Sequence, residues 1–278
     1  MTNTFRWTNR DVKLTMLTAY DAVTASLEAE CGVDILLVGD SVGTNVLGYD
    51  SPKSVTLSDM IHHTRAVRRG APNAFVLADL PFGTYTTPED ALANANQLVT
   101  AGADAIKAEG AIPEICAYLV HNGIQFCGHL GFTPQLIDRA AVQSKTVDEA
   151  AVLLRDSLDL QTNGCTMLVL ELVPEEVAAF VTAHLTLPTI GIGSGRYTSG
   201  QVLVINDLIG LNARHMRHSA RYAETGTEIK KAVAEYVKNA RSGSFPNTSH
   251  ASHMSPQDIL GLENLEPHEQ QKPHTLTG

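Results

Sequence analysis

Residues 34–40 read DILLVGD, and Ser41 follows directly. The run of apolar residues is short, is closed by Gly39, and predicts a strand that is buried along its whole length. A carboxylate (Asp40) and a hydroxyl (Ser41) therefore stand at the end of a buried strand. Their use depends on what the rest of the chain builds around them.

The same arrangement recurs along the chain, as apolar runs at residues 14–20, 33–40, 74–82, 104–110, 124–132, 165–172, 187–195 and 201–210. Segments with helical spacing lie between most of these runs, for example 58–70, 87–102, 147–164 and 174–185. Cap and first-turn signals open some of them, as at Thr87-Pro88 and Pro174, and glycines such as Gly102 close others. Apolar strands alternating with helices are typical of a parallel sheet covered by helices.

Eight such strands predict an α/β fold of the (β/α)8 TIM barrel type, with a doubly wound open sheet as the alternative. The eighth strand is the least certain, because residues 200–210 also fit the beginning of a helix. Residues 227–243 predict an amphipathic outer helix. The sequence thus predicts a single catalytic domain over 1–246 and a flexible tail over 247–278, where Ser, His, Pro and Gln accumulate.

Composition narrows the function classes. The net charge of −10 argues against a general affinity for nucleic acid or anionic membranes. No window has the apolar length of a membrane span, and the N-terminus lacks the apolar stretch of a signal peptide. The four cysteines form no C-x-x-C pair, which suits reduced thiols in the cytoplasm. The glycines at 191–195 (GIGSG) do not match the dinucleotide fingerprint. We expect a soluble cytoplasmic protein.

Parallel α/β folds bind ligands at the carboxyl ends of their strands. The polar residues at these ends are Asp40, Ser41, Asp79, Lys107, Glu109, His129 and Glu171. Three carboxylates on neighbouring strands, Asp40, Asp79 and Glu109, repel each other unless a cation lies among them. Mg²⁺ prefers oxygen ligands, so this group of carboxylates predicts a magnesium site. The alternative is that each acid caps the following helix or pairs with a lysine.

The other polar residues suggest how a substrate is held. Lys107 and Glu109 are two positions apart, so both side chains point to one face of their strand. A lysine beside the metal suits a substrate carboxylate, although an ion pair with an acid is the alternative. His129 is either a binding residue or a satisfied core histidine. Glu171 follows the apolar run MLVL, and desolvation there favours a general base; capping of the helix at Pro174 is the alternative.

Residues 16–85 strongly resemble the ketopantoate hydroxymethyltransferase (3-methyl-2-oxobutanoate hydroxymethyltransferase) family. So do AGADAIKAEG (101–110), GHLGFTPQ (128–135), LVLELVPEE (168–176), PTIGIGSG (188–195) and GQVLVINDLIGL (200–211). The likeness runs in the family's order from about Lys13 to Pro246. It implies a (β/α)8 barrel of the phosphoenolpyruvate/pyruvate superfamily, a Mg²⁺ ion, and a homo-oligomer, commonly a decamer.

The resemblance also implies an activity in pantothenate biosynthesis. The family transfers a hydroxymethyl group from 5,10-methylenetetrahydrofolate to 3-methyl-2-oxobutanoate, giving 2-dehydropantoate. Carried onto the matching positions, it implies metal ligation by Asp40, Asp79 and Glu109. Substrate contacts are implied for the set Ser41, Asp40, Asp79, Lys107 and His129. Glu171 is implied as the catalytic acid/base.

Two departures from the family pattern bear on the second substrate. Where the family has a glycine-rich stretch of the kind GGYKVQGR after GFTPQ, this chain has LIDRAAVQSKTVDEA, residues 136–150. The family's histidine-aspartate pair appears as Asn206-Asp207. Two other functions therefore remain open: another Mg²⁺-dependent aldolase or lyase of the superfamily acting on a 2-oxo acid, and a catalytically silent paralogue.

Overall fold

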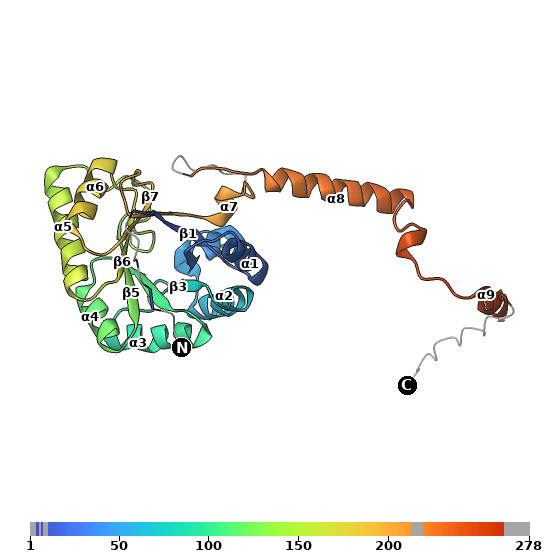
Figure 1. Ribbon diagram of the computed structural model, residues 1–278, viewed down its shortest axis with the longest axis horizontal. Helices are drawn as coiled ribbons and strands as arrows, with labels where there is room; N and C mark the ends of the chain where they lie inside the picture. The colour runs from blue at the N-terminus through green and yellow to red at the C-terminus, as the bar shows by residue number, and fades with distance from the viewer. Residues whose placement is uncertain (1–3, 6, 8–10, 213–218, 264–278) are drawn as a thin grey trace, which may run out of the picture. The chain divides into compact units, whose positions relative to one another are not determined.

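The computed structural model describes residues 4, 5, 7, 11–212 and 219–263. The chain divides into two units, Met1–Gly226 and Thr227–Gly278. The first unit is a closed barrel whose parallel strands follow chain order (Figure 1). They are β1 Leu14–Thr18, β2 Ile35–Val38, β3 Phe75–Asp79, β4 Ala105–Glu109, β5 Gln125–Gly131, β6 Met167–Glu171, β7 Thr189–Ile192 and β8 Gly200–Leu203. Pairing of β1 with β8 closes the ring, so the predicted TIM barrel is confirmed and the open sheet is excluded.

Helices alternate with the strands: α1 Ala22–Glu30, α2 Leu57–Gly70, α3 Pro88–Ala101, α4 Pro113–His121, α5 Val147–Thr162 and α6 Glu175–His184. Two short helical turns, η1 Gly43–Leu47 and η2 Pro52–Ser54, precede α2. Residues 193–199, all of them described, link β7 to β8 without a helix. The short helix α7 Ile205–Leu208 follows β8. The ambiguous eighth segment is therefore strand first and helix second.

The helix ends follow the signals in the sequence. The Thr87 hydroxyl accepts a hydrogen bond from the Asp90 backbone N–H at 3.1 Å, and Pro88 opens α3 as predicted. Gly102 closes this helix in the left-handed region, with φ of +118°, a conformation that costs glycine little. A capping box of Thr146 and Glu149 opens α5.

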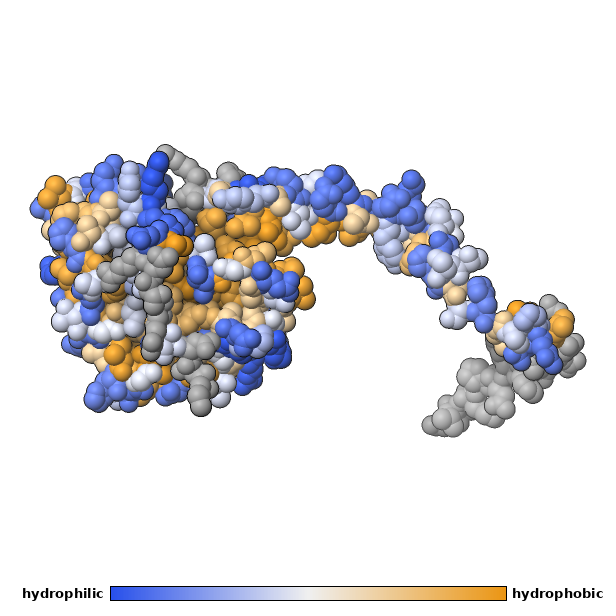
Figure 2. Space-filling view, viewed as in Figure 1, coloured by the Kyte–Doolittle hydropathy of each residue, from blue (hydrophilic) through white to orange (hydrophobic). Residues whose placement is uncertain are grey.

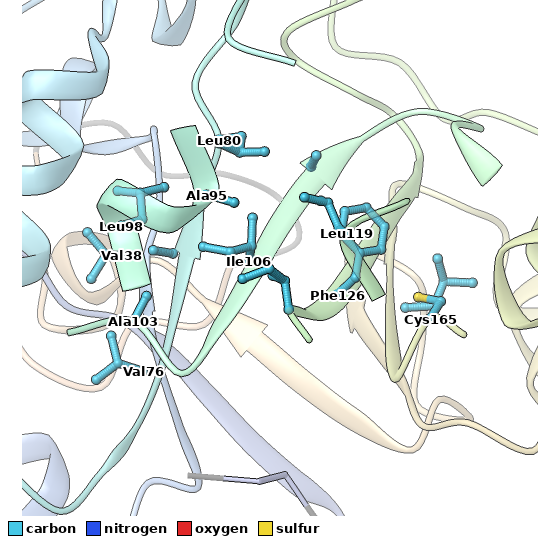
Figure 3. Close-up of a cluster of buried hydrophobic side chains, with 14 of the residues drawn as sticks. Val38, Val76, Leu80, Ala95, Leu98, Ala103, Ile106, Leu119, Phe126 and Cys165 are labelled. Atoms are coloured by element: carbon cyan, nitrogen blue, oxygen red, sulfur yellow. The ribbon is translucent and has the colours of Figure 1, made fainter. Parts of the chain in front are cut away.

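The apolar core has two layers. The outer layer lies between the strands and the helices, where Val38, Ile106 and Phe126 from the strands meet Leu98 of α3 and Leu119 of α4 (Figure 3). The inner layer fills the barrel with side chains of alternating strand residues: Leu14, Met16, Ile35, Leu37, Leu77, Ala105, Cys127, Met167, Val169, Ile190 and Val202. A barrel filled in this way is a packed core rather than a pore.

This alternation positions the polar residues. Side chains along a strand switch faces at every residue, so the position two beyond an inward apolar residue also points inward. Asp79 lies two residues beyond Leu77, and Glu171 two beyond Val169. Lys107 and then Glu109 follow Ala105 in the same way. The barrel is therefore apolar in its lower layers and polar at the carboxyl end.

The second unit holds most of α8 Thr225–Ser242, together with η3 Thr248–His250 and α9 Pro256–Glu263. The predicted amphipathic helix is thus confirmed, and apolar side chains gather along one side of α8 (Figure 2). Its outer position on the barrel, the boundary at residue 246 and the flexibility of 247–278 stay predictions, and 264–278 lie outside the described residues. Within the described part of the chain, no helix is long and apolar enough to cross a membrane.

Candidate active site

The predicted site residues meet at the carboxyl end of the barrel. In the strand register Asp79 pairs with Lys107, and Glu109 pairs with His129. Glu171 pairs with Gly131, one strand further along. Apart from Ser41 and Glu171, which are partly exposed, all of the predicted residues are buried, at 2–6% exposure: Asp40, Asp79, Lys107, Glu109 and His129. The structure therefore brings together every residue that was predicted from the strand ends.

Lys107 is the positive charge inside the site. Its Nζ lies 3.1 Å from Asp79 Oδ1 and 3.4 Å from His129 Nδ1. Burial alone would lower the pKa of Lys107, but Asp79, Glu109 and Asp40 outweigh it and raise that pKa above its usual value. Lys107 is therefore a fixed ammonium group. The ion pair with an acid, which the sequence left open as the alternative to substrate binding, does form with Asp79.

His129 links the two glutamates. Its Nδ1 lies 3.4 Å from Glu109 Oε1, and its Nε2 lies 3.2 Å from Glu171 Oε2. Burial and Lys107 lower the pKa of His129, but the carboxylates of Glu109 and Glu171 outweigh them and raise it to about 9. The same contacts hold the pKa of Glu109 below its usual value despite its burial. His129 is thus a second cation at neutral pH, and Glu171 faces it rather than a wholly apolar pocket.

Two residues of the site were missed in the sequence. Gln135 donates from Nε2 to Asp40 Oδ2, and from its backbone N–H to Glu109 Oε2, both at 2.8 Å. The Tyr20 hydroxyl lies 2.8 Å from Ser41 Oγ and fixes that side chain. Both residues stand in loops, where no periodicity marks an inward side chain. Their presence in the stretches that resemble the family was the available signal.

The charges of this site do not balance. Four carboxyl groups, those of Asp40, Asp79, Glu109 and Glu171, lie with two basic side chains, Lys107 and His129, so the acidic groups outnumber the basic ones by two. Burial and then Asp79 raise the pKa of Asp40 to about 7, although Lys107 opposes them. Burial likewise raises the pKa of Asp79 against the effect of Lys107. A further cation would relieve both.

The residues fit a divalent cation by their chemistry. Asp79 Oδ1 is buried and accepts no hydrogen bond from the described residues, although Lys107 Nζ lies 3.1 Å away. Carboxylate oxygens are the ligands that Mg²⁺ prefers. The side chains do not converge on one point, however. In the described residues, no three His, Cys, Asp or Glu side chains form a group that could hold a metal ion. Gln135 and His129 instead occupy oxygens of Asp40 and Glu109.

Glu171 stands where the backbone is most constrained. Gly131 lies opposite it with φ of +91°, and a side chain at Gly131 would collide with the carbonyl oxygen of Glu171. Leu172, the next residue, adopts the left-handed region with φ of +48°, which is uncommon for a bulky residue. Such conformations cluster at functional sites, because the surrounding structure must hold them.

A cavity of about 490 Å³ opens above this site. Asp40, Ser41 and Glu171 line it from the barrel. Other lining residues are Phe132, Pro134 and Ala140 from the loop after β5, Leu203 at the end of β8, and Val204 and Asp207 after it. The cavity has the size that holds small organic ligands, about 300–1,000 Å³. Together these features define a small-molecule site at the carboxyl end of a TIM barrel.

Comparison with known proteins gives the family. The family model for ketopantoate hydroxymethyltransferase matches residues 1–248. The 3-methyl-2-oxobutanoate hydroxymethyltransferase of Chloroflexus aggregans is 47% identical over 266 residues, covering 93% of this chain and 95% of that protein. The protein of the same name from Thermotoga neapolitana is 46% identical over 245 residues, covering 86% and 91%. This chain belongs to the ketopantoate hydroxymethyltransferase family.

The fold is also similar to that of solved structures. A phosphonomutase from Burkholderia cenocepacia superposes with a TM-score of 0.59 at 15% identity, covering 82% of this chain and 93% of that one. A 2,3-dimethylmalate lyase, a member of the PEP mutase/isocitrate lyase superfamily, gives 0.56 at 17% identity, with 91% and 90% covered. At such identities these structures show the shared barrel alone.

Proposed function

We propose that this chain is an enzyme that transfers a hydroxymethyl group from 5,10-methylenetetrahydrofolate to 3-methyl-2-oxobutanoate, giving 2-dehydropantoate in pantothenate biosynthesis. Water is consumed and tetrahydrofolate is released. The observation that carries the proposal is the buried cluster at the mouth of the barrel, in which four carboxyl groups surround the fixed cation Lys107 and His129. Membership of the family supports the same reading.

Binding of the oxo acid is assigned to the side of the cluster that holds Asp40, Ser41 and Lys107. The ammonium group of Lys107 attracts the carboxylate of the substrate, and Tyr20 holds the Ser41 hydroxyl ready to hydrogen-bond it. We propose Asp40, Asp79 and Glu109 as the ligands of Mg²⁺, with Asp40 and Asp79 also beside the oxo acid. When bound, the metal supplies Lewis acidity, which draws electron density from the oxo group.

Glu171 is proposed as the base that removes the proton from C3 of the oxo acid. It lines the cavity, its side chain is 17% exposed, and it stands on β6, two strands from Lys107 on β4. His129 positions it through the 3.2 Å contact and helps to fix the substrate. The carbon that loses the proton then forms the new bond to the one-carbon unit. Polar groups of this kind are most effective when the fold holds them in place beforehand.

Three wider statements rest on the family resemblance and on simple observations. The one-carbon donor is proposed to be the folate, because the cavity exceeds what a five-carbon acid fills. A homo-oligomer, commonly a decamer in the family, is proposed for the assembly. A cytoplasmic location is proposed, because Cys116, Cys127 and Cys165 are buried free thiols of a kind suited to a reducing compartment.

Product formation tests the function. The protein is incubated with Mg²⁺, 3-methyl-2-oxobutanoate and 5,10-methylenetetrahydrofolate, and proton NMR follows the appearance of 2-dehydropantoate. We expect product only when all three are present. Turnover of the oxo acid with another carbonyl compound but not with the folate would favour a superfamily aldolase or lyase, as the altered stretch 136–150 allows. No reaction of the oxo acid at all would indicate a silent paralogue.

A further inference from the structure

A second group of polar side chains lines the cavity, away from the charged cluster. Asp207, Asn212 and Ser219, all from the chain that follows β8, contribute to its wall. None of them was singled out from the sequence as a binding residue. The cavity of about 490 Å³ leaves space beside the oxo acid for a larger molecule.

Two of these side chains have unused hydrogen-bonding capacity. Ser219 is 8% exposed, and its hydroxyl is buried with no hydrogen-bond partner in the part of the chain that the structure describes. A buried hydroxyl without a partner is costly and calls for an explanation. The carboxylate of Asp207 lines the same cavity, and it too has no hydrogen bond or ion pair with the described residues.

The chain around Asp207 is held in place by hydrogen bonds of its neighbours. Asn206 donates from Nδ2 to the carbonyl oxygen of Asn45 in η1, at 3.3 Å. Asn212 donates from Nδ2 to Asn45 Oδ1, at 2.7 Å. Arg221 in turn donates to the carbonyl oxygen of Asn212, at 3.0 Å. Asp207 thus stands on a backbone fixed before any ligand arrives, as a binding group requires.

We propose that Asp207 and Ser219 bind the 2-amino-4-oxo edge of the pteridine ring of the one-carbon donor. That edge presents two adjacent N–H donors, N3–H and the 2-amino group, beside one carbonyl oxygen. An ionised carboxylate only accepts hydrogen bonds and takes two parallel donors well, so Asp207 matches the donors. The Ser219 hydroxyl donates to the 4-oxo oxygen. This inference rests on the proposed function, because it places the folate in the same cavity.

The remaining lining suits a flat ring. Phe132, Pro134, Ile192 and Leu203 give the cavity apolar walls. A pteridine ring has two apolar faces and one polar edge, and this cavity offers apolar walls and one polar group of residues. Glu171 and Ser41 lie at the charged part of the same cavity. The one-carbon unit of the folate would therefore meet C3 of the oxo acid between the two parts.

Asp207→Asn tests the proposal, with Asp148→Asn on the exposed start of α5 as the matched control. We expect the KM for 5,10-methylenetetrahydrofolate to rise about 10–100-fold in Asp207→Asn, because a charge-assisted hydrogen bond is lost. The KM for the oxo acid and the folate-free exchange of its C3 proton should stay within about 2-fold. Ser219→Ala is the second variant and should raise the folate KM about 3–10-fold.

A donor analogue in which a methyl group replaces the 2-amino group makes the test specific. We expect the wild type and Asp148→Asn to prefer the natural donor over the analogue, and Asp207→Asn to lose much of that preference. A folate KM unchanged in both Asp207→Asn and Ser219→Ala, in a wild type that makes 2-dehydropantoate, would overturn this inference and leave the proposed function standing. A wild type that makes no product with the folate would overturn both. Loss of C3 proton exchange in Asp207→Asn would also overturn it, by placing Asp207 in the oxo-acid half of the site.

Discussion

Two buried clusters of charge lie at opposite ends of the barrel strands. At the amino ends, Arg68 of α2 pairs with Asp104, which precedes β4. The guanidinium also donates from Nε to the Gly102 carbonyl oxygen and from Nη1 to that of Ala74, both at 2.8 Å. At the carboxyl ends, four carboxylates share Lys107 and His129. Among the described residues, the first cluster pairs one cation with one carboxylate, whereas carboxyl groups outnumber cations in the second.

The difference teaches where function resides in this fold. The Arg68–Asp104 ion pair stabilises the junction of α2, β3 and β4, and both side chains make further hydrogen bonds there. An excess of buried carboxylates is unfavourable by itself, and the fold tolerates it at the end of the barrel where ligands bind. The comparison gives four predictions, ordered from the largest expected effect to the smallest.

Glu171→Gln should lower the rate of C3 proton removal about 10²–10⁴-fold, because the amide cannot act as a base. Exchange of the C3 proton of 3-methyl-2-oxobutanoate in D₂O, followed by NMR, measures this. Binding of the oxo acid should change little. Glu176→Gln, on the exposed first turn of α6, is the matched control. Exchange at the wild-type rate in Glu171→Gln would remove this residue from the role of base.

Asp79→Asn should weaken Mg²⁺ binding about 100-fold, measured by calorimetry in the presence of the oxo acid, because a charged oxygen ligand is lost from the cluster. Asp90→Asn, in the exposed first turn of α3, is the control and should leave Mg²⁺ binding unchanged. If Asp79→Asn bound Mg²⁺ as tightly as the wild type, the cluster of carboxyl groups would not be a metal site.

Arg68→Met should lower the free energy of unfolding by about 2–4 kcal/mol, because it removes the guanidinium group that pairs with the buried Asp104 carboxylate. Catalytic activity per folded molecule should be unchanged. Arg69→Met, the exposed neighbour, should have no such effect on denaturant unfolding. A loss of activity without a loss of stability would mean that the Arg68–Asp104 cluster also serves the site, and the contrast between the two ends would fail.

Much of this arrangement could be predicted from the sequence, because the alternation of side chains along a strand indicates which of them share one face. Asp79, Lys107, Glu109 and Glu171 follow inward apolar residues at a spacing of two, so the rule that side chains alternate placed them at one end of the barrel. The cation that balances part of the charge, His129, was equally readable as a core residue. Its contacts with Glu109 and Glu171, which place it in the charged cluster, came only from the structure.

Residues in loops could not be placed in this way. Gln135 reaches Asp40 across the barrel mouth from a position 95 residues later in the chain. Ser219 faces the cavity from a segment with no regular structure. No periodicity predicts where a loop side chain points, since loop direction depends on contacts that only the folded chain makes. The sequence did predict the mutual repulsion of Asp40, Asp79 and Glu109, but the contacts by which Lys107 and His129 offset part of it are visible only in the structure.

Glu28 of α1 extends the comparison of the two clusters, because it is a buried carboxyl group that lies away from the barrel mouth. It is 4% exposed, neither carboxylate oxygen has a hydrogen-bond partner in the described residues, and burial raises its pKa to about 8. The folded state therefore holds the proton more tightly than the unfolded state. Its contribution favours folding most below pH 4.5, and that contribution declines as the pH rises to about 8.

Glu28→Gln should remove this dependence. We expect the variant to exceed the wild type in free energy of unfolding by on the order of 2 kcal/mol at pH 8, and to match it at pH 4.5. Denaturant unfolding at both pH values measures it, with the exposed Glu30→Gln on the same helix as control. An equal difference at both pH values would show that packing, not charge, sets the stability at Glu28.

The central claim is that the cluster of carboxyl groups at the carboxyl end of the barrel binds a divalent cation together with a 2-oxo acid and so loosens the proton on C3. Proton NMR of 3-methyl-2-oxobutanoate in D₂O, with the protein and Mg²⁺ and with no folate present, tests it most directly. The account predicts that the C3 proton signal disappears, and that EDTA stops the loss. Exchange at the same rate in the presence of EDTA would contradict the account.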